Sequence, residues 1–356
     1  MSHKKLFEAA TLGKMKLKNR IVMAPLTRSR AINNIPNDLM TEYYSTRAGA
    51  GLIITEGTSP SPNGLGYARI PGIFNQEQVQ GWKKVTDAVH KNDGHIFVQL
   101  MHTGRISHSA NMPTDAKILS ASATQAPGKM WTDAKGEQEH PVSMEMNVTE
   151  IKSTIQEYAQ SAKLAIEAGF DGVEIHGANG YLIEQFLNPG ANKRSDDYGG
   201  SNVNRMRFAL EVAEAVVNAI GGDRVGIRLS PYGVFNGSEI FDGIEPFYGE
   251  LAQKLSDLKL LYIHVVDHGS LGAPAVNSEV KRLIRQNFKG SYILSGGYDS
   301  ERAETDLVEN KGDFVSFGRA FISNPDLVLK LKQGLPLREP DPSTFYTPGP
   351  KGYTDY

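Results

Sequence analysis

Short, nearly continuous apolar runs alternate along the chain with longer amphipathic stretches. The alternation occurs eight times, and the runs are Ile21–Leu26, Gly51–Glu56, His95–His102, Gly172–His176, Val225–Ser230, Tyr262–Asp267, Tyr292–Gly296 and Phe314–Gly318. Apolar runs without polar alternation are typical of parallel strands that helices cover on the outside. The pattern predicts a (β/α)8 barrel, with an open doubly wound α/β sheet as the alternative because periodicity does not show closure.

The stretches between the runs have helical periodicity. Between Asn147 and Gly169 the apolar residues share one face, and Lys, Glu and Gln occupy the other. Asn324 followed by Pro325 predicts the start of the last helix, because asparagine caps helices well and proline suits the first helical position.

Two segments depart from the repeat. The polar and apolar alternation of Leu6–Arg20 predicts a small hairpin that caps the bottom of the barrel. Thr103–Val148 follows the third strand, is rich in Ser, Thr, Gly and Pro, and predicts a long excursion over the barrel mouth. No linker divides the chain, so residues 1–356 are predicted to form one domain.

Composition narrows the class of protein. The formal net charge of −2 and the lack of a long basic run give no attraction to nucleic acid or to an anionic membrane. The absence of cysteine excludes disulfides, thiolate metal sites and a cysteine nucleophile, and it fits a reducing compartment. The charged N-terminus lacks the apolar core of a signal peptide, and no segment has the length of a membrane span. We therefore expect a soluble, cytoplasmic protein.

Polar residues and glycines gather where the predicted strands end. In chain order they are Thr27, Glu56-Gly57, Gln99 with His102, His176 with Asn179, Arg228, His264 with Asp267, Gly296-Gly297 and Gly318-Arg319. Barrel enzymes carry their chemistry at this end of the strands. A strand end that meets solvent explains any one of these residues, whereas a polar group on nearly every strand indicates an active site.

Two of these strand ends suit a phosphate group. The glycines at 296–297 and at 318 let backbone N–H groups approach an anion, and Arg319 adds charge-assisted hydrogen bonds. Many barrels hold phosphate at the ends of strands seven and eight. The glycine motifs of Rossmann folds and P-loops are absent from the sequence. The pattern predicts a phosphorylated ligand, with an ordinary turn as the alternative at each glycine.

The segment His176–Tyr181 carries candidate catalytic groups. If the chain turns helically after the fourth strand, His176 and Asn179 fall on the same side and can hold one oxygen, as an oxyanion hole does. Tyr181 adds a hydroxyl with a reference pKa of about 10, which suits it to protonate a strongly basic carbon. The alternative is a hydrogen-bonded barrel histidine beside a packing aromatic, and spacing alone does not decide between them.

Five motifs together resemble the Old Yellow Enzyme family. They are Ile21–Arg28, Gln99–Arg105, His176–Tyr181, Asn192–Gly200 and Phe317–Arg319. They occur in the family's order, and the resemblance extends from Leu6 to Tyr356. Within the family, the sequence resembles the bacterial ene-reductases typified by pentaerythritol tetranitrate reductase, morphinone reductase and N-ethylmaleimide reductase. The resemblance implies an NAD(P)H-dependent enzyme that reduces activated alkenes such as enones, enals, maleimides and nitroalkenes.

The resemblance also implies FMN, bound without a covalent bond at the barrel mouth. The residues implied in cofactor binding are Pro25, Leu26, Thr27, Gly57, Gln99 and His176 at the ring, Arg228 at its N1–C2 edge, and Gly297, Gly318 and Arg319 at the phosphate. Reduced flavin is largely anionic, so a cation at Arg228 favours reduction. Thr27 can donate to the flavin O4, and the Gln99 amide suits an edge with donors and acceptors. The alternatives are an ion pair for Arg228 and a buried, backbone-bonded amide for Gln99.

A ping-pong cycle follows from the same resemblance. NAD(P)H reduces the flavin and leaves, and an electron-poor alkene takes its place. His176 and Asn179 then hold the carbonyl or nitro oxygen while hydride passes from flavin N5 to the β-carbon. Tyr181 protonates the α-carbon from the opposite face, and Thr27 tunes the flavin. The other implied substrate-pocket residues are Tyr67, Met101, Phe235 and Tyr346.

Two positions depart from the family pattern. Met101 stands where many relatives carry tryptophan, and Gly57 stands where alanine is common. A flexible methionine in place of an indole predicts a more open pocket. Structural packing remains an alternative for Tyr67 and Tyr346.

Two other functions stay open at this point. A metal-dependent barrel hydrolase or aldolase could use His102, His176, His264 and Asp267, since imidazole and carboxylate suit zinc. It lacks a compact motif such as His-x-His after the first strand. The second alternative is a flavin-binding protein without turnover, against which Tyr181 argues as a candidate acid. The sequence does not decide the physiological substrate, the choice of NADH or NADPH, the stereoselectivity, or whether the protein is a monomer or a homodimer.

Overall fold

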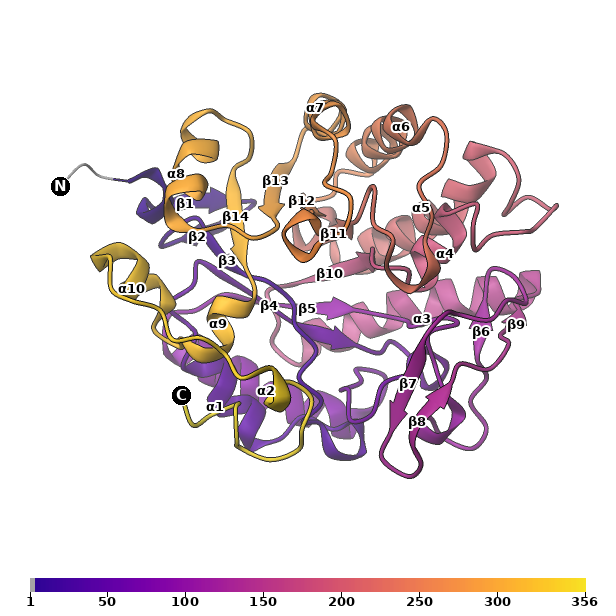
Figure 1. Cartoon of the computed structure of the whole chain (residues 1–356), viewed down its shortest axis with the longest axis horizontal. Coiled ribbons are helices and arrows are strands. Elements are labelled where there is room, and N and C mark those ends of the chain that lie inside the picture. The colour runs from indigo at the N-terminus through magenta and orange to yellow at the C-terminus, as the bar shows by residue number, and fades with distance from the viewer. Residues whose placement is uncertain (1–3) are drawn as a thin grey trace.

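A closed barrel of eight parallel strands forms the centre of the computed structural model, which describes residues 4–356 (Figure 1). The strands are β3 (Ile21–Met23), β4 (Leu52–Thr58), β5 (Ile96–Leu100), β10 (Gly172–Gly177), β11 (Val225–Leu229), β12 (Tyr262–Val266), β13 (Ser291–Ser295) and β14 (Phe314–Phe317). Pairing of β14 with β3 closes the barrel. The (β/α)8 prediction is confirmed, the open sheet is excluded, and every predicted run overlaps its strand.

Helices cover the outside of the barrel. They are α1 (Asp38–Ser45), α2 (Gln76–Lys91), α3 (Val148–Glu167), α4 (Leu182–Leu187), α5 (Asn202–Ile220), α6 (Ile244–Asp257), α7 (Ser278–Asn287), α8 (Ser300–Val308), α9 (Arg319–Ser323) and α10 (Leu327–Gln333). At the start of α3, the Asn147 side chain accepts from the backbone of Glu150, whose carboxylate accepts from the backbone of Asn147. The apolar helix faces and the strands share one large buried core. Within residues 4–356, none of these helices combines the length and apolarity needed to cross a membrane.

The predicted start of the last helix is wrong. Helix α9 ends at Ser323, and α10 begins only at Leu327, with no side-chain hydrogen bond at its N-terminus. The Asn324 side chain instead donates to the carbonyl of Ala320 and accepts from the backbone N–H of Arg338. These bonds, to the preceding helix α9 and to Arg338, replace the local cap that the sequence suggested.

The predicted hairpin closes the bottom of the barrel. It consists of β1 (Ala10–Leu12) and β2 (Met15–Leu17), which pair antiparallel. Leu12 and Leu17 are buried in an apolar cluster with Val22, Leu52, Ile54, Phe97, Leu261, Tyr262, Ile293 and Phe314. Most of these partners come from the barrel strands, so the hairpin seals the end opposite to the strand C-termini.

The predicted excursion after the third barrel strand is present. It contains β6 (Leu119–Ser120), which pairs with β9 (Met144–Glu145), and a hairpin of β7 (Lys129–Thr132) and β8 (Gly136–Glu139). Figure 1 shows this hairpin projecting beside the barrel, well away from the bottom hairpin of β1 and β2. The excursion therefore adds a wall at the mouth of the barrel.

Buried arginines hold the C-terminal segment, yellow in Figure 1, against the loop after β3. Arg28 donates to the carbonyl of Gly352 at 2.7 Å. Arg30 donates to the carbonyls of Thr344 and Lys351 at 2.8 and 2.9 Å. Both arginines follow β3 directly, so the first barrel strand and the end of the chain meet at the mouth.

Candidate active site

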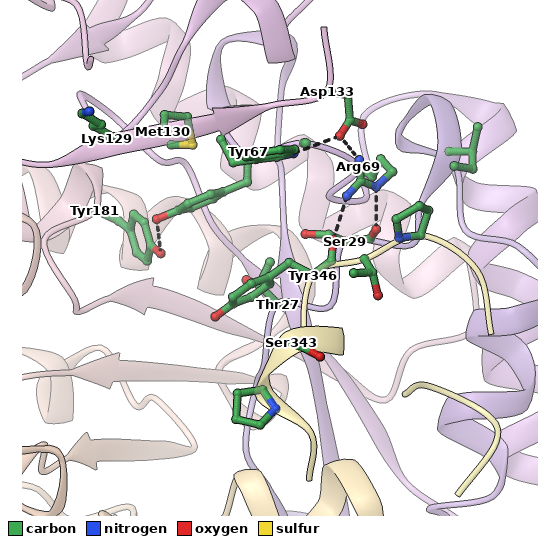
Figure 2. Close-up of a pocket in the computed structure, with 16 residues that line it drawn as sticks. Thr27, Ser29, Tyr67, Arg69, Lys129, Met130, Asp133, Tyr181, Ser343 and Tyr346 are labelled. Carbon is green, nitrogen blue, oxygen red and sulfur yellow. Dashed lines mark hydrogen bonds and ion pairs between the residues drawn. The ribbon is translucent and has the colours of Figure 1, made fainter. Parts of the chain in front are cut away.

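A cavity of about 810 Å³ lies at the barrel mouth, a volume in the usual range of ligand sites (Figure 2). Four of the predicted site residues line it, namely Thr27, Tyr67, Tyr181 and Tyr346. The loop after β3, the loop after β4, the β7–β8 hairpin and the C-terminal segment contribute further lining residues, among them Trp131. Residues far apart in the sequence thus meet at one cavity.

The two tyrosines at the cavity wall point toward each other. The hydroxyls of Tyr67 and Tyr181 lie 3.0 Å apart, and a dashed line in Figure 2 marks this hydrogen bond. Burial raises the pKa of Tyr181 to about 12. The Tyr181 phenol therefore keeps its proton at neutral pH and can release it only to a strong base.

His176 lies on β10 as a neutral imidazole. Its ring is 4.9 Å from that of Tyr181, edge to face. Burial, followed by the charge of Arg228, lowers the pKa of His176 well below its ordinary value. The backbone N–H of Ala178 donates to Nδ1 at 3.3 Å, so the ring proton belongs on Nε2. His176 can therefore donate one hydrogen bond from Nε2.

Asn179 does not lie on a helical turn, contrary to the condition stated in the sequence analysis. Asn179 has a φ of 59° and Gly180 a φ of 74°, and α4 starts only at Leu182. The Asn179 Oδ1 lies 2.7 Å from Nε2 of His268, a residue that the sequence analysis missed. With Oδ1 as the acceptor, the amide NH₂ of Asn179 remains a donor.

Glycines shape the ends of β13 and β14. A Cβ on Gly296 would lie 2.3 Å from the carbonyl oxygen of Asp267, and one on Gly297 would lie 2.4 Å from the Cβ of Ser270. A Cβ on Gly318 would meet nothing closer than 3.7 Å, so its backbone borders open space. The neighbouring Arg319 is exposed and forms no hydrogen bond or ion pair with residues 4–356. These features fit the predicted phosphate site.

Arg228 is a buried cation without a hydrogen-bond partner. Its side chain is 7% exposed, and its Nε is buried with no acceptor in the described part of the chain. No carboxylate lies within ion-pair distance of it there, which argues against the structural ion pair considered above. A buried guanidinium needs an acceptor, and the anionic edge of a reduced flavin can supply one.

Glu174 is a buried carboxylate that the sequence analysis missed. It accepts from Nε2 of Gln99 at 2.8 Å, and its second oxygen lies 2.9 Å from Nδ1 of His264. Burial alone raises its pKa, but His264 and then Arg228 bring the pKa below the ordinary value. The glutamate inside an apolar strand run was the signal that could have identified it. It fixes the orientation of the Gln99 amide.

The two departures from the family pattern touch each other. A Cβ on Gly57 would lie 2.4 Å from the sulfur of Met101, so the methionine occupies the space of a side chain at position 57. Met101 is 1% exposed and packs against Leu65 and Ile70 rather than lining the cavity. Met101 therefore does not border this cavity, and the more open pocket stays a prediction.

The remaining predicted residues surround these groups. Pro25 is buried and Leu26 half-buried directly before Thr27, in the loop after β3. The Phe235 ring lies 4.4 Å from the His268 ring, edge to face, on the loop after β11. Neither Phe235 nor His176 or Asn179 lines the large cavity itself. The structure thus brings Thr27, Tyr67, Tyr181 and Tyr346 to the cavity and places the other groups beside it.

The donor set of the metal-site alternative is not assembled. Both ring nitrogens of His264 are engaged, one by Glu174 and the other by Ser316. Asp267 forms an ion pair with Lys281 at 2.7 Å. Across residues 4–356, no three His, Asp or Glu side chains stand together in a way that could hold a metal ion.

Comparisons with known proteins agree with this geometry. Residues 5–338 match the model of the NADH:flavin oxidoreductase / NADH oxidase family. The chain is 41% identical to 12-oxophytodienoate reductase 7 of Oryza sativa subsp. japonica, covering 99% of this chain and 94% of the relative. It is 40% identical to a probable flavin mononucleotide-dependent alkene reductase of Leishmania infantum, covering 97% and 95%.

Solved structures give the same answer. Morphinone reductase superposes with a TM-score of 0.95 at 42% identity, covering 100% of this chain and 96% of that chain. The Old Yellow Enzyme homologue from Zymomonas mobilis superposes with a TM-score of 0.95 at 39% identity, covering 99% of both chains. Another structure shows morphinone reductase in complex with tetrahydroNAD. The chain therefore belongs to the NADH:flavin oxidoreductase / NADH oxidase family, the Old Yellow Enzyme family that its five motifs resemble.

Proposed function

We propose that the protein reduces activated alkenes at its barrel mouth, with His176, Asn179 and Tyr181 as the side chains that handle the substrate. The chain is an FMN-dependent oxidoreductase of the alkene-reductase type, and NADH or NADPH is its reductant. The substrate class is the electron-poor alkene, with enones, enals, maleimides and nitroalkenes as members. The roles of the individual residues follow from the contacts described above.

The residues present fit FMN. The unpartnered guanidinium of Arg228 suits the N1–C2 edge of the ring, and the exposed Arg319 beside Gly297 and Gly318 suits the phosphate. The other ring contacts are assigned to Pro25, Leu26, Thr27, Gly57, Gln99 and His176. When bound, FMN supplies the hydride for the β-carbon of the substrate from its N5.

His176 and Asn179 bind the substrate oxygen. Both are neutral donors, because burial keeps the pKa of His176 low and the amide of Asn179 carries no charge. As the double bond is reduced, the oxygen gains negative charge and accepts more strongly from both groups. Hydrogen bonds that strengthen in this way lower the barrier rather than merely tightening binding.

Tyr181 delivers the proton to the α-carbon. Its phenol lines the cavity, and the Tyr67 hydroxyl 3.0 Å away can reorient to support it as the proton leaves. A pKa of about 12 keeps the proton in place until a carbanion-like base forms. The single observation that carries the proposed function is this phenol at the cavity wall, with a neutral histidine ring 4.9 Å from it.

Measuring the two half-reactions one after the other, in the absence of oxygen, tests this function. The purified protein should be yellow, lose its colour with NADH or NADPH, and regain it when 2-cyclohexenone is added, with cyclohexanone as the product. Comparing the two nicotinamides gives the cofactor preference. A colourless protein that does not take up FMN would overturn the proposal. Bleaching without recovery by any activated alkene would instead indicate a flavin-binding protein without turnover.

Three expectations about the protein in the cell stay predictions. The cysteine-free chain suits the reducing cytoplasm. Its small net charge of −2 gives no reason for binding to nucleic acid or to an anionic membrane surface. A monomer or a homodimer is expected, and light scattering coupled to size-exclusion chromatography distinguishes them.

A further inference from the structure

The backbone just before Tyr181 adopts an uncommon conformation. Asn179 and Gly180 are both left-handed, with φ of 59° and 74°. Such values suit glycine and are uncommon for a residue with a side chain, although asparagine tolerates them. A Cβ on Gly180 would lie 2.6 Å from the carbonyl oxygen of Phe235, so only glycine fits there. This stretch needs hydrogen-bond partners to hold it.

Hydrogen bonds connect the backbone N–H groups of both left-handed residues to one carboxyl group. Gly180 donates directly to Oε2 of Glu184. Asn179 donates to Oγ of Ser230 at 2.8 Å, and the Ser230 hydroxyl donates to Oε1 of Glu184 at 2.8 Å. Glu184 therefore anchors the two left-handed residues, one directly and one through Ser230.

Two further bonds complete the support of this stretch. The Asn236 side chain donates to the carbonyl of Asn179 at 2.7 Å. The Gln185 side chain, next to Glu184 on α4, donates to the carbonyl of Gly180 at 2.7 Å. Every backbone polar group of the two residues is thus satisfied by a side chain.

Glu184 is buried without a cation. It is 2% exposed and lies on α4 among Leu182, Ile183, Phe186 and Leu187. In the described part of the chain, no Lys, Arg or His forms an ion pair with it. Burying an unpaired carboxyl group is unfavourable, so packing and stability do not account for a glutamate at this position. Its hydrogen bonds to the loop do.

We propose that Glu184 is a positioning residue for alkene reduction: through Gly180 and Ser230 it fixes the backbone that presents the Asn179 amide and the Tyr181 phenol to the substrate. Glu184 touches neither the cavity nor the predicted cofactor residues, so it acts only through this loop. The inference rests on the proposed function, and it adds a residue that the substrate roles alone do not contain.

The protonation state of Glu184 then matters. Burial raises the pKa of Glu184 to about 7. The ionised carboxylate accepts hydrogen bonds from Gly180 and Ser230, and the Tyr248 hydroxyl of α6 also lowers its pKa. The protonated carboxyl group would have to point its own O–H at one of these donors. The charged groups around this cluster include Arg205 of α5, whose charge acts on Tyr248, and Arg105, whose guanidinium donates to the carbonyls of Asn236 and Gly237. The loop is therefore held best above neutral pH.

The substrate-handling groups do not titrate in the same range. The pKa of His176 is lowered well below its ordinary value, that of His268 is lowered to about 4 by burial, and that of Tyr181 is raised to about 12. Glu56 is the other buried carboxyl whose pKa burial raises to about 7. It accepts from Arg28 N–H and the Tyr44 hydroxyl rather than from the 179–181 loop, which makes it a matched control.

The experiment measures the binding of 2-cyclohexenone, which has no titrating group, to the oxidised holoenzyme from pH 5.5 to 9. The change in flavin absorbance gives the Kd. We expect the wild-type Kd to be several-fold larger, and binding therefore weaker, below pH 6 than above pH 8. Glu184→Gln should bind weakly at every pH, Glu184→Asp should recover part of the dependence, and Glu56→Gln should keep the wild-type inflection.

The outcomes separate this inference from the proposed function. A wild-type inflection retained in Glu184→Gln would overturn the positioning role, whereas a wild-type enzyme that reduces no alkene would overturn the function. Flavin content and thermal melting establish that each variant is folded. If Glu184→Gln does not fold, Ser230→Ala removes the link to Asn179 together with one donor to Glu184, and it keeps the direct bond from Gly180. It should weaken binding above pH 8 by a smaller factor, and wild-type binding in that variant would contradict the inference.

Discussion

The substrate side of the site, at the end of β10, and the cofactor side, formed by Arg228 and Arg319, differ in how far the protein satisfies its own polar groups. At the end of β10, Asn179 and Gly180 find hydrogen-bond partners for their backbone groups, and the Asn179 side chain bonds to His268. On the cofactor side, the side chains of Arg228, on the neighbouring strand β11, and of Arg319, after β14, form no hydrogen bond within residues 4–356. The protein therefore prepares the substrate side by itself, and it leaves the cofactor side to be completed by a ligand.

The difference has an energetic reason. Donors fixed in advance stabilise developing charge without reorganisation, so a catalytic loop gains from being held in its final conformation. A buried guanidinium without an acceptor is unfavourable, and a tightly bound anion removes that penalty. Substitutions on the substrate side should therefore change rates and substrate binding. Substitutions on the cofactor side should change FMN affinity and, by mass action, the thermal stability of the holoenzyme.

The largest effect is expected for Tyr181→Phe, on the substrate side. Loss of a general acid slows proton transfer by roughly 10²–10⁴-fold, so reoxidation of the reduced enzyme by 2-cyclohexenone should slow by that factor. Reduction of the flavin by NAD(P)H needs no proton from Tyr181 and should stay close to the wild-type rate. Anaerobic stopped-flow absorbance measures both steps. Tyr67→Phe should slow reoxidation far less, because it keeps the Tyr181 hydroxyl and removes only its hydrogen-bond partner. Equal slowing of both half-reactions in Tyr181→Phe would contradict the role.

The double substitution of His176 and Asn179 to Ala tests the same side through binding. Two hydrogen bonds to the substrate oxygen are lost, each worth about 1 kcal/mol or more, so the Kd of a phenol or enone should rise by roughly 10–100-fold. FMN should remain bound, because the cofactor side keeps Arg228 and Arg319. Absorbance titration gives the Kd, and flavin content gives the occupancy. Loss of FMN would mean that the two residues mainly hold the cofactor or the fold rather than the substrate.

The fold could be predicted because its signal is repeated. Each barrel strand is an apolar run buried on both faces, and eight such runs leave little choice of architecture. The last helix could not be placed, since Asn324 bonds to Ala320 and Arg338 rather than to the helix start. A local capping rule fails where tertiary contacts compete for the same side chain.

The candidate site could be predicted where one residue carries the chemistry, as Tyr181 does. It could not be predicted where a group acts through several segments. Glu174 joins β5 to β12, and Glu184 joins α4 to the end of β11, so their partners are distant in sequence. Both could have been suspected, because a carboxylate inside an apolar run must find partners when it is buried. The sequence does not say which partners those are.

On the cofactor side, Arg319→Ala should weaken FMN binding. A hydrogen bond to a charged group contributes about 1.5–3 kcal/mol, so the Kd of FMN should rise by roughly ten-fold or more. Alkene reduction at saturating FMN should change little. Quenching of flavin fluorescence on titration of the apoprotein measures the Kd. Arg282→Ala is the matched control, because it removes the same charge at a position away from the site. Arg282 pairs with Glu279 on the exposed surface of α7. Equal FMN affinity in the two variants would contradict the phosphate assignment.

The smallest effect is expected at the rim of the cavity, for Asp133→Asn. Arg69 forms an ion pair with Asp133 of the β7–β8 hairpin and donates to the carbonyls of Ser29 and Tyr346, at 2.9 and 2.7 Å (Figure 2). Asp133 is half exposed, with 51% of its side chain accessible, and such pairs contribute about 0–1 kcal/mol. The KM for bulky enones should therefore rise only about two-fold at low salt. Salt at roughly 0.5 M screens the wild-type pair and should remove the difference. A ten-fold change, or one that persists at high salt, would place Asp133 on the prepared substrate side rather than at its rim.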